Sequence, residues 1–276
     1  MSAASLAGAS VALAGGGKMG LAMLEGWAAH GLAGPGVLVL EPAPSPRLSQ
    51  LCADKGYRLA APGAAGAPAD ALVLEIKPQM LDAAAPALQG LVGPQTFVLS
   101  ILAGKRLCDL SARFAAARAI VRAMPNTPAA IGRGIAGAFA SAGTSAAQRA
   151  LADALLAAVG GVEWLDDEEQ IDAVTAVSGS GPAYVFYLVE ALAAAGVAAG
   201  LAPELSARLA RATVEGSGEL LRRSPEISPE TFRQNVTSPG GTTAAALAVL
   251  MAEDGLAPLM ERAVAAAKAR GAELAG

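Results

Sequence analysis

Two glycine-rich segments of the chain have the residue types needed to hold a negatively charged ligand. The first, GGGKMG, begins at Gly15 and lies between an apolar run and a helical pattern. In the spacing G-x-G-x-x-G the first glycine allows a tight turn, the second allows contact between backbone and pyrophosphate, and the third allows close packing of the helix on a sheet. The pyrophosphate then lies at the helix N-terminus, where backbone N–H groups point at it. The segment predicts a dinucleotide site that contains Gly15, Gly17, Lys18, Met19 and Gly20.

The second segment, SPGGTT, begins at Ser238 and leads into an alanine-rich helical pattern. Its glycines leave backbone N–H groups uncovered, and the start of the following helix carries partial positive charge. The serine and threonine hydroxyls add donors, so the segment is suited to a carboxylate. An ordinary N-cap beside a glycine loop is the alternative interpretation. The predicted substrate-binding residues here are Ser238, Gly240, Gly241, Thr242 and Thr243.

Two more candidate loops follow apolar, strand-like runs. Ile76-Lys77-Pro78 ends the run ALVLEI, and the turn SILAG follows the next such run. Ligands of open parallel sheets bind beyond the carboxyl ends of the strands, so a lysine at such an end points at the ligand crevice. A solvated surface lysine is the alternative. We expect the cofactor to be contacted by Ile76, Lys77, Pro78 and Ala103.

Strand-like and helical patterns alternate through the first part of the chain. Alternation of this kind, opened by a strand–glycine loop–helix unit, is typical of a parallel sheet covered by helices. We predict an α/β fold whose N-terminal domain, residues 1–163, is a Rossmann-like, doubly wound parallel sheet. The predicted strands are Ser10–Ala14, Val37–Leu40, Ala71–Ile76, Thr96–Ile101, Ala119–Met124 and Ile135–Phe139, and the first helix is Leu21–His30.

Strand signals stop from Asp166 onward, where periodic stretches rich in Ala, Leu and Glu take over. We predict an all-α C-terminal domain, residues 164–276, that binds substrate. Its apolar content exceeds what one small bundle buries, so we expect this domain to mediate dimerisation. The predicted helices are Ile171–Val177, Ala183–Ala199, Pro203–Arg223, Ser228–Val236, Thr242–Gly255 and Ala257–Ala269, with a break at the SGSGP between the first two.

Composition excludes several classes of protein. Hydrophobic residues make up 54% and charged residues 16%, which excludes a disordered chain. The net charge is −4 and there is no basic block, which argues against nucleic acid as a partner. His30 is the only histidine, so metal sites built on several histidines are excluded. A Ser-His-Asp triad is excluded as well, unless His30 is its histidine. We expect no metal.

The sequence also carries signals about location. The N-terminal segment MSAASLAGAS has no basic region and does not resemble a signal peptide. The apolar stretch Val185–Leu201 contains Glu190, and a membrane span of ~20 apolar residues is not expected there. Cys52 and Cys108 are far apart and predict free thiols in a reducing compartment. We expect a cytoplasmic protein with no membrane partner.

The choice between NADPH and NADH depends on the end of the second strand. Glu41 stands there, where an acidic residue binds the ribose 2′-hydroxyl of NADH. Ser45 and Arg47 follow closely and are suited to the 2′-phosphate of NADPH, because arginine pairs with phosphate through two parallel hydrogen bonds. Both cofactors therefore stay open.

Three segments resemble the pyrroline-5-carboxylate reductase family. Asp172–Leu201 is similar to its signature D-A-x-T-A-x-S-G-S-G-P-A-Y and the helix that follows it. Arg122–Ala129 resembles R-x-M-P-N-T-P-A, and Asn235–Thr243 resembles N-V-x-S-P-G-G-x-T. The loops at Lys77 and Ala103 resemble the family's V-K-P and S-x-x-A-G turns. The resemblance covers essentially the whole chain, and the motifs occur in the family's order.

This resemblance implies NAD(P)H-dependent reduction of 1-pyrroline-5-carboxylate to L-proline, the final step of proline biosynthesis. It implies a homodimer formed through the helical domain, commonly assembled into decamers. It also implies that Asn235 lies at the cofactor, and it supports a Glu168 that faces the iminium charge. The alternative is that Glu168 is one acid of the solvated run Asp166–Glu169. Lys77 and Thr243 are the catalytic candidates.

The expected chemistry requires no strong base. A protonated ring imine is already electrophilic, so hydride can reach the carbon of the C=N bond when the reactants are positioned and water is excluded. Thr243 is the candidate for a hydrogen bond to the ring nitrogen, as an orienter or relay. The SGSGP run contains no acid, base or ligand suited to the reaction, and we expect it to shape the substrate pocket and to allow close approach of helices across a dimer.

Three other functions compete with this one. A β-hydroxyacid dehydrogenase needs a lysine as proton acceptor, but Val185 stands at that place, and no lysine occurs between Lys105 and Lys268. A nonenzymatic dinucleotide sensor has no need of the loop that begins at Ser238. A reductase of another cyclic imino acid stays open, as does the number of subunits.

Overall fold

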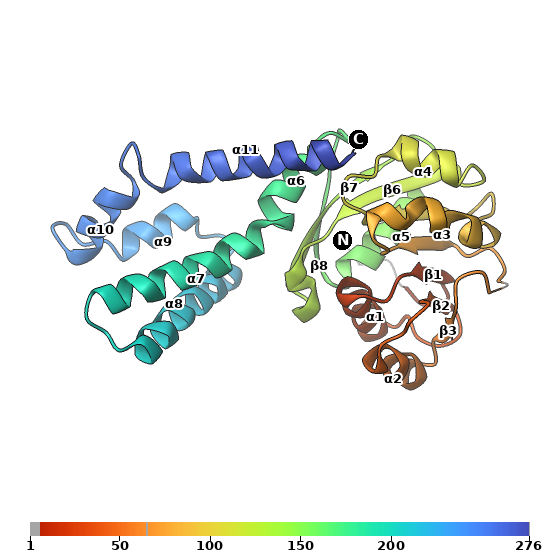
Figure 1. Ribbon diagram of the computed structural model, residues 1–276, viewed down its shortest axis with the longest axis horizontal. Helices are drawn as coiled ribbons and strands as arrows, with labels where there is room; N and C mark the ends of the chain where they lie inside the picture. Colours follow the sequence, from red (N-terminus) through yellow and green to blue (C-terminus); the bar gives the residue numbers. More distant parts are fainter. Residues whose placement is uncertain (1–5, 65, 276) are drawn as a thin grey trace. The chain divides into compact units, whose positions relative to one another are not determined.

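The computed structural model describes residues 6–64 and 66–275, and these form two compact units (Figure 1). The first unit contains the described residues up to Ser180 together with those from Ala267 onward, and the second is Gly181–Ala266. The division lies later than the predicted boundary after residue 163. The reason is that β8 (Gly160–Trp164) completes the sheet and α6 (Gln170–Val174) packs against it.

Among the described residues, an eight-stranded sheet forms the centre of the first unit, in the order β3-β2-β1-β4-β5-β6-β7-β8. The direction of winding reverses between β1 and β4, which is the topological switch point of a doubly wound sheet. The Rossmann-like α/β fold expected from the sequence is therefore confirmed. Besides β8, the strands are β1 (Val11–Ala14), β2 (Val37–Leu40), β3 (Arg58–Ala60), β4 (Ala71–Leu74), β5 (Phe97–Ser100), β6 (Ala119–Met124) and β7 (Gly134–Ala140).

Two details of the sheet differ from the prediction. The strand β7 runs antiparallel to β6, with Val121 opposite Ala140, so the sheet is mostly rather than wholly parallel. Only a short 3-10 turn, η3 (Thr127–Ile131), joins the two strands, and a parallel crossover needs a much longer connection. The strands β3 and β8 were not predicted, because both lie at edges of the sheet and neither is a continuous apolar run.

Helices cover both faces of this sheet. Successive residues of a strand point to opposite faces, so the strand side chains divide between two buried clusters. One cluster includes side chains of α1, α2 and α5, and the other includes side chains of α3 and α4. These helices are α1 (Lys18–Ala29), α2 (Pro46–Lys55), α3 (Leu81–Leu88), α4 (Leu107–Arg113) and α5 (Ala146–Ala157), with short 3-10 turns η1 (Pro78–Met80) and η2 (Gln89–Leu91).

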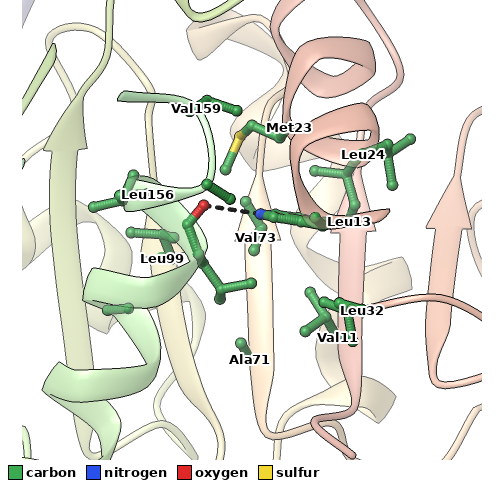
Figure 2. Close-up of a cluster of buried hydrophobic side chains, with 14 of the residues drawn as sticks. Val11, Leu13, Met23, Leu24, Leu32, Ala71, Val73, Leu99, Leu156 and Val159 are labelled. Atoms are coloured by element: carbon green, nitrogen blue, oxygen red, sulfur yellow. Dashed lines mark hydrogen bonds between the residues drawn. The ribbon is translucent and has the colours of Figure 1, made fainter. Parts of the chain in front are cut away.

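Figure 2 shows the first of these clusters, where Leu13 and Val73 of the neighbouring strands β1 and β4 lie near Met23 and Leu24 of α1. All four side chains are fully buried. This packing fixes α1 over β1 and so determines where the glycine loop between them lies.

Local signals in the sequence explain several helix starts. The Ser45 hydroxyl accepts a hydrogen bond from the Leu48 N–H at 3.2 Å, and Pro46 occupies the first position of α2. Ser145 and Gln148 form a capping box at the start of α5.

The SGSGP run does not break the helix, contrary to the prediction. Helix α6 continues through a π-helical turn, η4 (Thr175–Gly179), into α7 (Gly181–Ala198). The Ser180 N–H donates to the Thr175 carbonyl at 2.8 Å, which is the wide bond of a π turn. The Ser178 hydroxyl donates back to the Val174 carbonyl at 3.0 Å. The small polar residues therefore widen one turn and leave the helix continuous.

The second unit is helical, as predicted. Helices α7 and α8 (Pro203–Arg223) form an antiparallel hairpin, in which the Ser206 hydroxyl donates to the Ala193 carbonyl at 2.6 Å. A Cβ at Gly196 would lie 2.1 Å from this hydroxyl oxygen, so a larger residue there would disturb this hydrogen bond. The remaining helices are α9 (Pro229–Asn235), α10 (Thr242–Leu250) and α11 (Leu256–Ala275), the last of which ends in the first unit.

Apolar side chains of the second unit are largely exposed within this single chain. Among its described residues, only Ser206 and Ala210 are buried. Phe186 is 62% exposed and Tyr187 is 69% exposed, both on α7. An apolar surface of this extent is typical of an interaction site.

One finding bears on the prediction that this region contains no membrane span. Among the described residues, the continuous helical run Gln170–Ala198 is long and apolar enough to cross a membrane by length and composition alone. Helices from the cores of soluble proteins pass the same test, so the run is weak support for a membrane span.

A buried hydrogen bond in the first unit generates a prediction about stability. Trp27 of α1 is fully buried, and its indole N–H donates to the Leu155 carbonyl at 2.9 Å. Replacing Trp27 with phenylalanine leaves this carbonyl without the donor and leaves space beside it. We expect Trp27→Phe to lower the free energy of unfolding by about 1–3 kcal/mol, measured by chemical denaturation.

Trp164→Phe is the matched control. The Trp164 indole N–H donates to the Asp153 carboxylate at 2.9 Å, but Trp164 is only half-buried, so water can replace the lost donor. If Trp164→Phe lowered the free energy of unfolding as much as Trp27→Phe does, the prediction would be contradicted.

Candidate functional site

The candidate dinucleotide site lies at the carboxyl ends of the central strands. The register aligns Ala14 at the end of β1 with Leu40 of β2 on one side and Leu74 of β4 on the other. The residues that follow, Gly15 and two glutamates, therefore emerge at one edge of the sheet. This edge includes the topological switch point, which is where ligands of such sheets bind.

Gly15 makes the turn that the sequence motif predicts. Its φ is +106°, and a Cβ placed on it would lie 2.3 Å from the Glu75 carbonyl oxygen. A side chain is excluded there for both reasons. Helix α1 begins at Lys18, and its N-cap residue, Gly17, has no side chain of its own that could cap the helix. Lys18 is exposed, Met19 is half-buried and Gly20 is buried against the sheet.

Glu41 follows β2 and accepts hydrogen bonds from two backbone N–H groups. Its Oε2 accepts from Gly16 at 2.9 Å, and its Oε1 accepts from Ala43 at 3.1 Å. The two other residues considered for nucleotide selection have local partners. Ser45 caps α2, and the Arg47 guanidinium pairs with Glu25 of α1 at 2.7 Å.

A further carboxylate at this edge was not predicted from the sequence. Glu75 directly follows β4, and its Oε2 accepts a hydrogen bond from the Gly17 N–H at 3.0 Å. Burial raises the pKa of this carboxyl group, while hydrogen bonds from the loop backbone oppose the rise. The only signal in the sequence was a single acid inside an otherwise apolar run.

Side chains from the start of α1, the end of β6 and the loops after β4, β5 and β6 line an open cavity of about 170 Å³. Its lining is largely apolar and consists of Met19, Glu75, Ile76, Ile101, Met124 and Pro125. Lys77 and Ala103 belong to two of these loops but are exposed and do not line the cavity, and Pro78 starts the turn η1.

The segment that resembles R-x-M-P-N-T-P-A supplies a turn and an anchor. The Asn126 side-chain oxygen accepts from the Ile135 N–H at 2.9 Å, which holds the connection between β6 and β7. Arg122, on β6, is buried and pairs with Glu168 at 2.6 Å.

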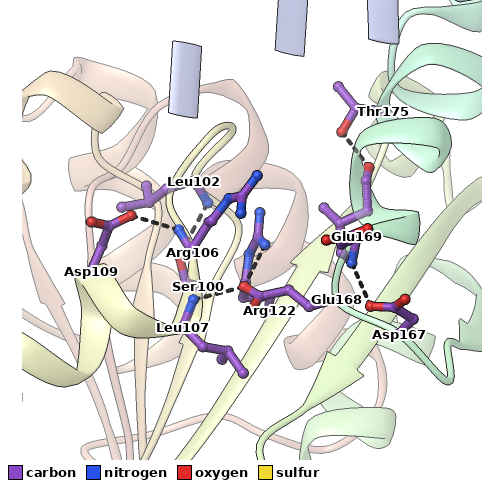
Figure 3. Close-up of polar contacts among 11 residues, drawn as sticks. Ser100, Leu102, Arg106, Leu107, Asp109, Arg122, Asp167, Glu168, Glu169 and Thr175 are labelled. Atoms are coloured by element: carbon purple, nitrogen blue, oxygen red, sulfur yellow. Dashed lines mark hydrogen bonds and ion pairs between the residues drawn. The ribbon is translucent and has the colours of Figure 1, made fainter. Parts of the chain in front are cut away.

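Glu168 is held by two groups in the first unit, as Figure 3 shows. Its Oε1 accepts from the Arg122 guanidinium at 2.6 Å and from the Leu107 N–H, at the start of α4, at 2.7 Å. A buried guanidinium requires such a partner, because an uncompensated charge in the interior is strongly destabilising. Both of these hydrogen bonds go to Oε1. Glu168 also lines a second cavity, of about 210 Å³.

The candidate carboxylate loop belongs to the second unit. Gly240 has a φ of +69°, and the Gly241 N–H donates to the Ser238 carbonyl at 3.0 Å, closing the turn before α10. The N-cap residue of α10, Gly241, has no side chain that could cap the helix, and Thr242 and Thr243 are the first two residues of the helix. Ser238, Gly240 and Thr242 are exposed, Gly241 and Thr243 are half-buried, and Asn235 is the exposed last residue of α9.

The predicted site residues thus form two groups. The cofactor residues other than Asn235, together with Glu168, belong to the first unit, and Asn235 and the Ser238–Thr243 loop belong to the second. Each group includes a glycine turn that precedes the start of a helix.

Comparison with known proteins identifies the family. Residues 168–274 match the family model for pyrroline-5-carboxylate reductase dimerisation. The chain is 41% identical to a pyrroline-5-carboxylate reductase of Pseudomonas aeruginosa over 96% of both chains. It is 44% identical to the enzyme of that name from Synechocystis over 74% of this chain and 75% of the relative.

Comparison with solved structures points to the same family. A pyrroline-5-carboxylate reductase from Coxiella burnetii superimposes with a TM-score of 0.89 at 33% identity, over 97% of this chain and 99% of the other. The fold is also that of a Plasmodium falciparum pyrroline carboxylate reductase with NADP bound, with a TM-score of 0.80 at 24% identity over 98% of this chain and 99% of that one. By sequence identity over nearly its whole length, this chain belongs to the pyrroline-5-carboxylate reductase family.

Proposed function

We propose that the protein reduces 1-pyrroline-5-carboxylate to L-proline with NADPH or NADH. The observation that carries this proposal is the 41% identity, over 96% of both chains, to a relative that bears the name of this enzyme. The glycine loop at the topological switch point supports the use of a dinucleotide, and the Ser238–Thr243 loop supports a substrate with a carboxylate.

The chemistry fits the residues that this chain offers. Bound NADPH or NADH would supply hydride to the carbon of the C=N bond, and the ring nitrogen, protonated in the iminium, becomes the amine of proline. The backbone N–H groups at the start of α1 would hold the pyrophosphate, and those at the start of α10 would hold the substrate carboxylate. Once a ring is bound, the apolar side chains of Met19 and Ile101 would help to exclude water from the hydride path.

Thr243 orients the ring nitrogen in this proposal. It is the second residue of α10 and is half-buried, whereas Ser238 is exposed on the turn before the helix. A hydroxyl is a weak acid, so Thr243 acts by hydrogen bonding and not by strong acid catalysis. Lys77 is exposed at the end of β4 and stays a candidate at the nicotinamide side.

Glu168 would act on the substrate through one oxygen only. Its Oε1 is shared between Arg122 and the Leu107 N–H, so Oε2 is the atom that would face the iminium charge. The pair with Arg122 would then fix the direction of the carboxylate.

The contacts of Glu41, Ser45 and Arg47 bear on the choice of cofactor. Glu41 stands where it would accept from a ribose 2′-hydroxyl, which favours NADH. Arg47 would have to exchange Glu25 for a 2′-phosphate in order to favour NADPH. The proposal is therefore that both cofactors are used.

The exposed apolar face of the second unit supports a homodimer formed through this unit, and the match to a dimerisation family supports the same arrangement. We extend this to a larger assembly, a decamer, and to a cytoplasmic location. In a dimer, burial of α7 between subunits would explain the apolar run Gln170–Ala198 without a membrane.

The proposed activity is tested by following NADPH or NADH oxidation with 1-pyrroline-5-carboxylate, using 1-piperideine-2-carboxylate for comparison. We expect turnover with both cofactors and a preference for the five-membered ring. The ratio of kcat/KM for the two cofactors then measures the preference. Absence of cofactor oxidation with the five-membered imine would refute the proposed function.

Two substitutions in the second unit separate orientation from binding. Thr243→Ala removes the hydrogen bond to the ring nitrogen, and we expect kcat to fall about tenfold to a hundredfold with little change in KM. Ser238→Ala removes a donor to the carboxylate, and we expect KM to rise about tenfold.

Thr243→Ser is the matched control, because it keeps the hydroxyl and should retain most of the turnover. If Thr243→Ala changed KM alone, Thr243 would be a binding residue without a role in orientation.

A charge on the exposed face of α7 tests the dimer. Phe186→Asp places a carboxylate at a side chain that is 62% exposed in the single chain. We expect this variant to shift the protein toward monomer in sedimentation velocity, because an unpaired buried charge opposes association.

Ile131→Asp is the control. Ile131 is 76% exposed in the first unit, and its substitution should leave the oligomeric state unchanged. A Phe186→Asp protein of unchanged size would show that this part of α7 is not the interface.

A further inference from the structure

The Glu75 carboxylate occupies the hollow that the three glycines of the dinucleotide loop create. A Cβ on Gly17 would lie 2.9 Å from Glu75 Oε1, and one on Gly20 would lie 3.0 Å from Oε2. The Gly15 position is closed by the backbone of the same glutamate. All three glycines of the fingerprint therefore face one acidic residue.

This carboxylate uses donors that a dinucleotide also needs. The Gly17 N–H donates to Oε2 at 3.0 Å, and the N–H groups of Gly20 and Met19 also stabilise the ionised form. Helix α1 has no acidic residue in its first turn and, among the described residues, no side-chain cap of its own. Glu75 is thus the negative partner of this helix N-terminus in the free protein.

A second carboxylate adds to the negative charge of the loop. Glu41 accepts from the Gly16 N–H, so consecutive N–H groups of the glycine loop donate to two different glutamates. The charge of Glu41 raises the pKa of Glu75, in addition to the larger effect of burial.

The basic residues near the glycine loop make none of the hydrogen bonds described for Glu41 and Glu75. Lys18 begins α1 and Lys77 follows Glu75 by two positions, and both are exposed. The residues that line the cavity beside Glu75 from the end of β6 and from the loops after β5 and β6 are uncharged: Ile101, Met124 and Pro125.

We propose that Glu75 competes with the pyrophosphate of the dinucleotide for the backbone donors at the start of α1, so that cofactor binding displaces or protonates this carboxylate. The proposal rests on the proposed use of a dinucleotide. Two anions cannot share the same few N–H groups without mutual repulsion, and each binds most tightly when the other is absent or neutral. Glu75 therefore weakens cofactor binding and couples it to proton uptake.

The competing explanation is that Glu75 positions the glycine loop and so strengthens cofactor binding. The two explanations predict opposite signs for the same substitution. Glu75→Gln keeps the size of the side chain and removes its charge. Competition predicts tighter binding by this variant, whereas loop positioning predicts weaker binding.

The experiment measures the Kd of NADH for the intact protein and for Glu75→Gln by calorimetry at pH 8. NADH is the probe because it lacks the 2′-phosphate, whose own titration near pH 6 would interfere. We expect Glu75→Gln to bind NADH about tenfold more tightly, which corresponds to a coupling of one pKa unit. Glu163→Gln, on the exposed face of β8, removes the same formal charge from the first unit and should leave the Kd unchanged.

Proton uptake provides a second measurement, on the unaltered protein. The pKa of Glu75 is raised in the free protein, and a bound pyrophosphate raises it further, so binding takes up protons as the pH falls toward that pKa. We expect the NADH affinity of the unaltered protein to increase from pH 8 to pH 6, and the heat of binding to depend on the ionisation enthalpy of the buffer. For Glu75→Gln, both the pH dependence of the NADH affinity and the buffer dependence of the binding heat should be smaller.

Equal or weaker binding by Glu75→Gln at pH 8 would overturn the proposal, as would equal proton uptake by both proteins. If Glu75→Gln does not fold, absence of proton uptake by the unaltered protein overturns it alone. If NADH binds with the expected coupling but the imine is not reduced, the proposed function fails and the competition stands. If neither protein binds NADH or NADPH, both the proposed function and the proposed competition are refuted.

Discussion

The first unit depends on one close approach, between the start of α1 and the ends of β1 and β4. At Gly15 the turn leaves no room for a Cβ, because the Glu75 carbonyl oxygen would lie 2.3 Å away. This approach directs the first N–H groups of α1 toward the switch point of the sheet. The buried packing of Met23 and Leu24 against Leu13 and Val73 holds the helix in that position. The geometry of the candidate cofactor site is thus a product of core packing.

Much of this arrangement could be predicted from the sequence, because its causes are local. Apolar runs such as Val37–Leu40 mark buried parallel strands, and glycine spacing marks the turn before α1. The family resemblance carried by the SGSGP run and the Ser238–Thr243 loop was confirmed by the comparisons.

The features that were missed depend on contacts between distant segments. In the sequence Glu75 is one residue of an apolar run, and only the pairing of β4 with β1 brings it beside Gly17. The pair of Arg122 with Glu168 joins β6 to the segment before α6, and nothing local marks it. The SGSGP run reads as a break, since glycine and proline usually end helices, but a π turn and the Ser178 hydroxyl keep the helix continuous.

The positions of the two tryptophans have an optical consequence. Both Trp27 and Trp164 belong to the first unit, and the second unit contains none. Tryptophan emission therefore reports on the dinucleotide-binding unit alone, and Trp27 reports on the helix that carries the glycine loop. The state of this unit can be followed by intrinsic fluorescence, without an added label, while the helical unit associates or dissociates in the same sample.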